Sequence, residues 1–376
     1  MVCLFSSLVA ALALAGADLE ADAESLRIIE AVEAAEALYD PIRIEYVETM
    51  RRTPETIKAD MKEAARRTDG KSTILESRQE IIFHRSGIRE LAIERDLTRS
   101  TTDEFSGQRS ICFDGERTVS IERDDRGEDG ALASSVVNVT DAPINHQLHL
   151  TPHVMLMLSG KDSIPLSEFF RGNELGPSRT LIPYDGNVRL TYGGEEVIAN
   201  EPCDVLTWDY FRPDGVHGTR RVFWLAKNKN YIPLRQTIYS IRASPDQPTS
   251  ESAASELEEA LPGLWFPRRS EISTFSSMDL SRGKGPNKLY DVERMVTALS
   301  LTESLPADAC EDITIEPGST VYTIENDKIV SAIKTLPEEV ESASPVPGRR
   351  PDNAFRWSWV LVLVVAVAAI LVWRRR

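Results

Sequence analysis

The chain has 376 residues, of which 41% are hydrophobic and 27% charged, and its formal net charge is −16 at pH 7. An acidic surface of this kind repels phosphate backbones, so nucleic acid is not expected as a partner. The length and the apolar content allow one large domain or two small ones with a sizeable core.

The N-terminal residues 1–17 are apolar and rich in small side chains, and they end in Ala15-Gly16-Ala17 before Asp18 begins a polar chain. This pattern predicts a secretory signal peptide over residues 1–17. No Lys or Arg precedes the apolar run, so an uncleaved anchor is the alternative. Cys3 lies before the run rather than after it, which argues against a lipoprotein signal.

The next segment combines a helix with the first strand. Residues 20–38 predict an amphipathic helix because Ile28 and Val32 begin an apolar stripe at helical spacing. Residues 42–46 alternate apolar and charged side chains, which predicts a half-buried strand. Residues 53–67 are mostly charged and predict a surface helix between two strands.

From residue 73 the pattern is that of an antiparallel meander. Ser86-Gly87 and Asp114-Gly115 are turn signals between predicted strands. Gly193-Gly194 is interpreted as a further hairpin turn, and Thr151-Pro152 as the start of a helix. Residues 244–259 are polar at first and then predict a short helix. The predicted strands are 73–84, 88–97, 109–113, 118–122, 179–183, 188–192, 196–198, 203–210, 220–225, 234–241, 264–275 and 290–301.

This order predicts the fold class. Strands do not alternate with long helices, so a doubly wound sheet is not expected. We predict a mainly β (α+β) domain over residues 18–303, built on one strongly curved antiparallel sheet or unclosed barrel with covering helices. Residues 304–335 predict a small β appendix, and residues 336–356, rich in Pro, Ser and Glu, a disordered stalk.

The C-terminus carries the strongest signal for localisation. Residues 357–373 contain no charge, with Trp357 and Trp359 at one edge and Trp373 at the other. About seventeen residues at ~1.5 Å rise nearly cross a hydrocarbon core, and tryptophans favour its interfaces. We therefore predict a transmembrane helix.

The last residues orient this helix. A cytoplasmic tail is predicted over residues 374–376, because Arg374, Arg375 and Arg376 directly follow the apolar run. The N-terminal domain is then expected outside the cytoplasm, in a periplasmic or extracellular location. The alternatives are a buried C-terminal helix and a sorting signal that is cut off on export.

Three cysteines remain after signal cleavage, namely Cys112, Cys203 and Cys310. Their spacing supports neither a zinc site nor a thioredoxin-type motif. One pair could be bridged in an oxidising compartment, or all three could be buried thiols. The sequence leaves the pairing open.

Three segments carry turn and strand motifs. They are Phe113-Asp114-Gly115-Glu116 between two strands, Trp224-Leu225 before a polar turn and Tyr231-Ile232-Pro233-Leu234-Arg235, and Gly263-Leu264-Trp265-Phe266-Pro267. Together these motifs resemble the Lol-type (LolA/LolB-like) lipoprotein carrier superfamily. The resemblance covers residues 25–301 in order of elements. It implies a curved, unclosed sheet whose concave side shelters acyl chains or an apolar partner segment. The chain departs from the soluble carriers in its length and its predicted anchor.

The sequence offers little for catalysis or metal binding. His146, His149 and His153 are the one ligand-like cluster, but Pro152 places the first two before the expected helix and no carboxylate lies at a ligand offset. We interpret the cluster as a polar loop and predict no metal, no cofactor and no catalytic residue. Nucleophile-elbow, metalloprotease and phosphate-loop motifs are absent from the sequence.

The predicted function is therefore the binding of a hydrophobic ligand, a lipid or an acylated protein, by a membrane-tethered cell-envelope protein that is not an enzyme. The alternative is a sensor or scaffold subunit that recognises a protein partner in a membrane complex.

Overall fold

The structure is a computed structural model, and it describes residues 19–54, 56, 76–97, 107–124, 134–140, 151–157, 164–176, 181–310, 320–325 and 328–334. The chain separates into two compact units, residues 1–335 and 336–376, and all the described residues belong to the first unit. The predicted signal peptide, stalk, transmembrane helix and cytoplasmic tail lie outside the described residues. Among the residues that are described, no helix is long and apolar enough to cross a membrane.

The described part is mainly β. Its helices are α1 (Ala23–Glu36), the short 3₁₀ helix η1 (Ala37–Tyr39), α3 (Leu166–Phe170) and α4 (Ser277–Ser281). Its strands are β1 (Leu19–Ala21), β2 (Ile42–Arg52), β3 (Glu76–Ser86), β4 (Arg89–Asp96), β5 (Gly107–Phe113), β6 (Thr118–Asp124), β7 (Ser134–Thr140), β8 (Asn173–Leu175), β9 (Leu181–Pro183), β10 (Asn187–Ile198), β11 (Glu201–Phe211), β12 (His217–Ala226), β13 (Ile232–Ser240), β14 (Ser250–Leu261), β15 (Leu264–Phe275), β16 (Lys288–Ser300), β17 (Thr320–Glu325) and β18 (Lys328–Lys334).

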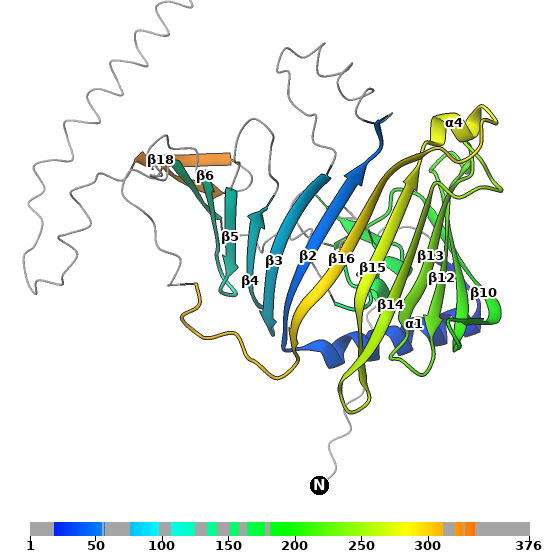
Figure 1. The fold of residues 1–376 in the computed structure, drawn as a ribbon, viewed down its shortest axis with the longest axis horizontal. Coiled ribbons are helices and arrows are strands. Elements are labelled where there is room, and N and C mark those ends of the chain that lie inside the picture. The colour runs from blue at the N-terminus through cyan, green and yellow to red at the C-terminus, as the bar shows by residue number, and fades with distance from the viewer. Residues whose placement is uncertain are drawn as a thin grey trace, which may run out of the picture. The chain divides into compact units, whose positions relative to one another are not determined.

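One 16-stranded sheet holds nearly all of these strands, in the order β1-β10-β11-β12-β13-β14-β15-β16-β2-β3-β4-β5-β6-β7-β17-β18. The pairs β1–β10 and β17–β7 are parallel, and the other neighbours in this sheet are antiparallel. Among the described strands, β1 and β18 stand at opposite ends of this order and do not pair with each other, so the sheet is unclosed. Figure 1 shows the sheet curving, with α1 on one side. The prediction of a mainly β, curved and unclosed sheet is confirmed.

The helix α1 forms because its N-terminus is capped and its apolar residues fall on one face. Asp22 caps the N-terminus by accepting a hydrogen bond from the backbone N–H of Ser25 at 2.7 Å. Ile28, Ile29 and Val32 recur at helical spacing and are buried. They pack on the side of the sheet that we call the inner face, and the opposite side is the outer face.

The inner face carries the two larger clusters of buried apolar residues. One cluster joins α1 and α3 to β10–β12, with Trp208 stacked on Phe169 at 4.7 Å between ring centroids. A second cluster joins η1 and residue Met155 to β2–β4, β15 and β16. Large side chains such as Tyr46, Phe83 and Phe266 are fully buried there. Helices and core residues thus cover much of the inner face.

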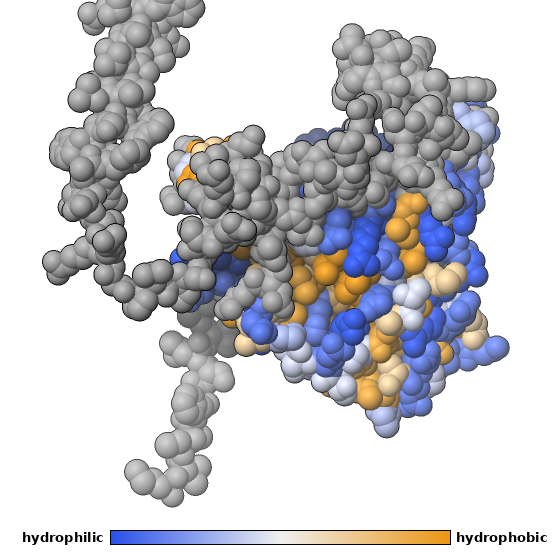
Figure 2. All heavy atoms as spheres, turned by 60° about the vertical axis from the view of Figure 1, so that its left-hand side comes forward, coloured by the Kyte–Doolittle hydropathy of each residue, from blue (hydrophilic) through white to orange (hydrophobic). Residues whose placement is uncertain are grey.

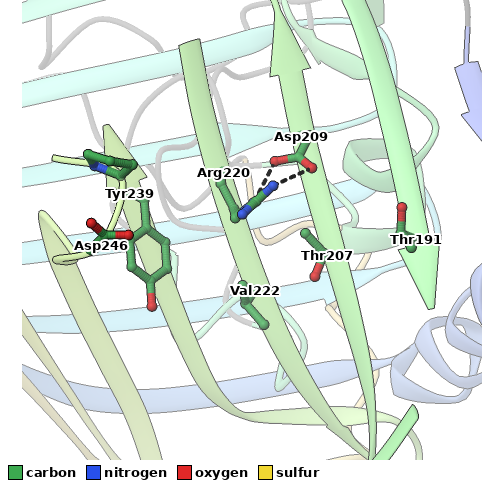
Figure 3. A pocket seen from close by; sticks show the side chains of 8 residues that line it. Thr191, Thr207, Asp209, Arg220, Val222, Tyr239 and Asp246 are labelled. Carbon is green, nitrogen blue, oxygen red and sulfur yellow. Dashed lines mark hydrogen bonds and ion pairs between the residues drawn. The ribbon is translucent and has the colours of Figure 1, made fainter. Parts of the chain in front are cut away.

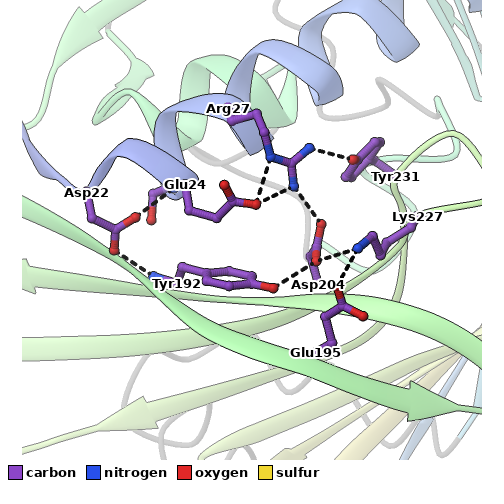
Figure 4. Close-up of polar contacts among 9 residues, drawn as sticks. Asp22, Glu24, Arg27, Tyr192, Glu195, Asp204, Lys227 and Tyr231 are labelled. Carbon is purple, nitrogen blue, oxygen red and sulfur yellow. Dashed lines mark hydrogen bonds and ion pairs between the residues drawn. The ribbon is translucent and has the colours of Figure 1, made fainter.

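A polar network ties the start of α1 to β10–β12 (Figure 4). Its centre is Asp204, whose side chain is 0% exposed. The Asp204 carboxylate accepts hydrogen bonds from Arg27 of α1 at 3.1 Å and from the Tyr192 hydroxyl at 3.2 Å. Lys227 lies 3.5 Å from the same carboxylate. A buried charge is tolerated here because it has several partners.

Three local predictions were wrong. Gly193-Gly194 is a bulge inside β10 rather than a hairpin turn, and the turn falls at Ala199-Asn200, where both φ angles are positive. Residues 250–261 form the strand β14 rather than a helix. The prediction missed this strand because small polar residues such as Ser250 and Ser252 occupy its buried side, so apolar and polar residues do not alternate along it. Thr151-Pro152 opens a run of turns rather than a helix.

Some other predictions fall partly or wholly outside the described residues. The surface helix over 53–67 is described only at residues 53, 54 and 56. The segment predicted as a β appendix contributes β17 and β18, which extend the sheet through the parallel pairing of β17 with β7.

Candidate functional site

A segment that we call the strap, residues 301–310, follows β16 and runs along the outer face of β2–β5. Its backbone is held by side chains of successive strands. The Nε2–H of His84 on β3 donates to the Glu303 carbonyl at 2.9 Å, since a carbonyl oxygen only accepts. Arg89 at the start of β4 donates to the carbonyls of Leu305 at 3.0 Å and Pro306 at 3.1 Å.

A disulfide fixes the far end of the strap. Cys310 is bonded to Cys112 on β5, with 5.4 Å between the Cα atoms and 198 residues between them in sequence. Of the cysteines that the structure describes, Cys203 is the free one; it is buried, and burial raises the pKa of its thiol to about 11. A thiol with this pKa is protonated at neutral pH and therefore unreactive. The pairing that the sequence left open is thus Cys112–Cys310.

A pocket of about 480 Å³ lies between the strap and the sheet. Its floor is aliphatic, because the outer-facing residues of β3, β4 and β6 include Ile82, Leu91, Ile93 and Ile121. Ile82 and Ile93 are directly opposite each other across the β3–β4 ladder. The strap adds Leu305, Pro306 and Ala309 as the other wall. We call this site the strap pocket.

The polar residues of the strap pocket already have protein partners. Arg43 contacts Glu45 at 2.6 Å and Glu303 at 3.1 Å, so its charge is balanced. The Gln108 side-chain amide donates to the Ser110 hydroxyl at 3.1 Å. His84 is occupied by the strap backbone, as described above. The arrangement offers apolar contact area and a polar rim, and none of these contacts pairs a nucleophile with a base.

The volume suits a small ligand or one segment of a chain, since ligand pockets commonly span about 300–1,000 Å³. Apolar area removed from water contributes roughly 25 cal/mol per Å², so an aliphatic ligand gains most from this floor. The resemblance implied a ligand on the concave side. In the described residues, α1, α3 and the two core clusters pack on that side, and the strap pocket opens on the outer face.

Sequence reasoning missed the strap pocket. A signal was present in β3, where Ile81, Ile82 and Phe83 form a continuous apolar run instead of an alternating one. Such a run indicates a strand that is covered on both faces. Ile81 and Phe83 indeed lie in the inner core, and Ile82 lines the pocket. The strap itself had no periodicity to reveal it.

Of the three clustered histidines, His153 lies in the described part of the chain, and the interpretation of the cluster as a polar loop stays a prediction. His146 and His149 lie outside that part. His153 is buried, and its Nε2 lies 2.7 Å from the carbonyl oxygen of Asn230. Burial lowers the pKa of His153 to about 4, so the ring is neutral at pH 7. No group of three or more His, Cys, Asp or Glu residues that could hold a metal occurs in the described part of the chain.

The membrane-anchor residues, namely Trp357, Trp359, Trp373, Arg374, Arg375 and Arg376, also lie outside the described residues. Their prediction from sequence is neither confirmed nor contradicted.

On the face drawn in Figure 2, apolar residues of the described part lie in rows between hydrophilic ones.

Similarity to known proteins is found among solved structures. No protein-family model matches the chain, and no curated protein matches it. A DUF1329 family protein from Desulfovibrio piger aligns with 12% identity and a TM-score of 0.39, over 76% of this chain and 95% of that one. A Vibrio parahaemolyticus protein described as an outer membrane lipoprotein-sorting protein domain aligns with 9% identity and a TM-score of 0.39, over 77% and 98%.

The Mycobacterium tuberculosis lipoprotein LppX aligns with 9% identity and a TM-score of 0.22, over 76% of this chain and 100% of that one. All three alignments have TM-scores below 0.5. Lipoprotein sorting is how one of those proteins is described. A function for this chain has to follow from its own residues.

Proposed function

We propose that this protein binds an apolar ligand, a lipid or the acyl chain of an acylated protein, in the strap pocket. The observation that carries the proposal is the aliphatic floor of Ile82, Leu91, Ile93 and Ile121 beneath a disulfide-held strap. A chain of methylene groups matches such a floor, because its binding needs contact area and no hydrogen bonds.

We propose binding without catalysis. The ionisable groups at the pocket, Arg43, His84 and Glu303, hold one another and the strap in place. A catalytic acid, base or nucleophile would instead face the ligand with a free position. No cofactor is part of the proposal.

We further propose that the protein is tethered in the cell envelope. Residues 1–17 would direct export, residues 357–373 would span the membrane, and residues 374–376 would stay on the cytoplasmic side. The sheet would then face the periplasm or the exterior, an oxidising location in which the Cys112–Cys310 bond persists.

A second candidate function is recognition of a protein partner. It is favoured by β18, the end strand of the sheet, on which Ile329 and Ile333 are each 63% exposed. An unpaired edge with apolar side chains can accept an added strand from another chain. Such a partner could be a membrane protein beside the proposed anchor.

The test uses a photoreactive fatty acid with an alkyl diazirine, added to cells that express the full chain. After irradiation, we expect cross-linked peptides to map to β3–β6 and to the strap. Ile93→Glu places a charge on the aliphatic floor and is expected to abolish this labelling. The matched control, Ile329→Glu, changes an exposed isoleucine and should leave it intact.

Labelling confined to residues 357–373, or labelling that Ile93→Glu leaves unchanged, would contradict ligand binding in the strap pocket. Loss of a co-purifying protein on Ile329→Glu alone would favour the second candidate function.

A further inference from the structure

A second pocket, of about 520 Å³, lies on the outer face of β10–β13 and is separate from the strap pocket. It is lined by Thr191, Thr207, Asp209, Arg220, Val222, Tyr239, Pro245 and Asp246. Figure 3 shows Asp246 beside the ring of Tyr239, with Arg220, Asp209, Thr207 and Thr191 on the successive strands to one side. We call this site the polar pocket.

The polar pocket has a rigid centre. Arg220 donates from Nε and from a terminal nitrogen to the two oxygens of the Asp209 carboxylate, at 2.8 and 3.2 Å. His217 contacts the same carboxylate at 2.8 Å. Asp209 and Arg220 are also directly opposite each other in the β11–β12 ladder. This planar pair holds the guanidinium in one orientation, with its other terminal nitrogen available to a ligand.

Around this centre, several groups have hydrogen-bonding capacity that the described residues do not use. They are the carboxylate of Asp246 and the hydroxyl groups of Tyr239, Thr191 and Thr207, which make no side-chain hydrogen bond to a described residue. Hydroxyls both donate and accept, the carboxylate accepts, and the guanidinium donates. The pocket therefore offers a mixed set of donors and acceptors on four strands and one loop.

The lining discriminates between classes of ligand. One guanidinium that is already paired faces two carboxylates, so a phosphate or a carboxylate ligand would meet net repulsion. Val222 and the ring of Tyr239 provide some apolar surface, but the other polar groups would be left without partners under an acyl chain. A neutral molecule with several hydroxyl groups satisfies the donors and acceptors, and its C–H face can pack on the ring of Tyr239.

We propose that the polar pocket binds a neutral saccharide. Arg220 and Asp246 would bond ring hydroxyls from two sides, and Tyr239 would contact the ring face. This inference is independent of the strap pocket, because the two pockets share no residue.

The test is ligand-observed NMR on the full chain in a detergent without sugar groups. The probes are glucose, galactose and N-acetylglucosamine, with inorganic phosphate and octanoate as comparison ligands. We expect saturation transfer to at least one sugar and no competition by phosphate. Asp246→Asn should weaken sugar binding ~10-fold, because it removes a charge-assisted hydrogen bond.

Paired variants separate binding from folding. Tyr239→Ala removes ring and hydroxyl and should weaken binding more than Tyr239→Phe, which keeps the ring. Asp308→Asn, an exposed aspartate of the strap, is the matched control for Asp246→Asn and should change nothing. Unchanged thermal unfolding would show that each variant is folded. Absence of transfer to all three sugars, equal binding by Tyr239→Ala, or displacement by phosphate would each overturn the proposal.

Discussion

At the residue scale, two buried tyrosines allow a matched comparison. The Tyr39 hydroxyl donates to the Trp265 carbonyl and lies 3.2 Å from the side-chain oxygen of Asn230. The Tyr46 hydroxyl is buried and has no hydrogen-bond partner among the described residues. Tyr39→Phe should therefore lower the free energy of unfolding by about 1–3 kcal/mol, because the Trp265 carbonyl loses the hydrogen bond that the hydroxyl donates. Tyr46→Phe should be neutral or stabilising. Chemical denaturation measures both, and equal losses would contradict the assignment.

Glu90 predicts a dependence of stability on pH. Burial raises the pKa of its carboxyl to about 7, with Asp40 adding to the rise and Arg85 opposing it. The unfolded chain releases this proton near the ordinary value, whereas the folded chain keeps it up to about pH 7. Stability from this group is thus lost as pH rises from about 4.5 to 7. Glu90→Gln should reduce this loss of stability, which thermal unfolding at pH 5 and pH 8 would measure.

Exposed Glu116, which lies in the turn after β5, provides the matched control substitution, Glu116→Gln. His153 contributes with the opposite sign. Its folded pKa of about 4 lies below the ordinary value, so its contribution to stability is lost as pH falls from about 6.5 to 4. A profile of Glu90→Gln that matches the parent chain would show that Glu90 ionises normally.

At the scale of elements, the disulfide should control the strap. Cys112→Ala with Cys310→Ala opens a loop of 198 residues, worth up to about 5 kcal/mol in the chain-entropy model. We expect lower stability, proteolysis within the strap, and loss of fatty-acid labelling in the strap pocket. Cys203→Ala makes the same change at the free cysteine. This control should retain both the protected strap and the labelling, and a strap that stays protected in the double variant would contradict the prediction.

The attachment of α1 to the sheet depends on Asp204. Asp204→Ala removes the buried acceptor that Arg27 and Tyr192 share and should lower the free energy of unfolding by about 1–3 kcal/mol. Glu195→Ala breaks a contact of Lys227 with a carboxylate that is 56% exposed, and it should change stability little. Hydrogen exchange of α1 amides would show whether the helix detaches first. A mild effect of Asp204→Ala would mean that the network is dispensable.

The same scale explains what the sequence could predict. Alternation along residues 42–46 and the turn at Ser86-Gly87 gave β2 and the β3–β4 hairpin, because both signals are local. The β16–β2 pairing joins strands some 250 residues apart, and the parallel β1–β10 and β17–β7 pairings have no turn between them. Nothing local encodes such partners. The strap pocket depends on the β16–β2 pairing, which brings the strap to the sheet, and on one disulfide. The apolar run of β3 indicated a covered strand, but no local pattern identified the strap that covers it.

At the scale of the whole molecule, the curved sheet presents different chemistry on its two faces. The inner face is covered by α1, α3 and core side chains. The outer face carries an aliphatic pocket on β3–β6 and a polar pocket on β10–β13. A glycolipid has an acyl part, which would fit the strap pocket, and a saccharide part, which would fit the polar pocket. The two pockets can be tested separately because each has its own variants.

The last prediction concerns the anchor. The first compact unit ends at Thr335, and the apolar run begins at Trp357. A chain that ends at Thr335 should be found in the soluble fraction after cell breakage, whereas the full chain should need detergent. Replacing Arg374, Arg375 and Arg376 by glutamate should keep the run apolar but weaken its orientation, which protease accessibility in intact cells would report. Recovery of the full chain in the soluble fraction would show that residues 357–373 do not hold it in a membrane.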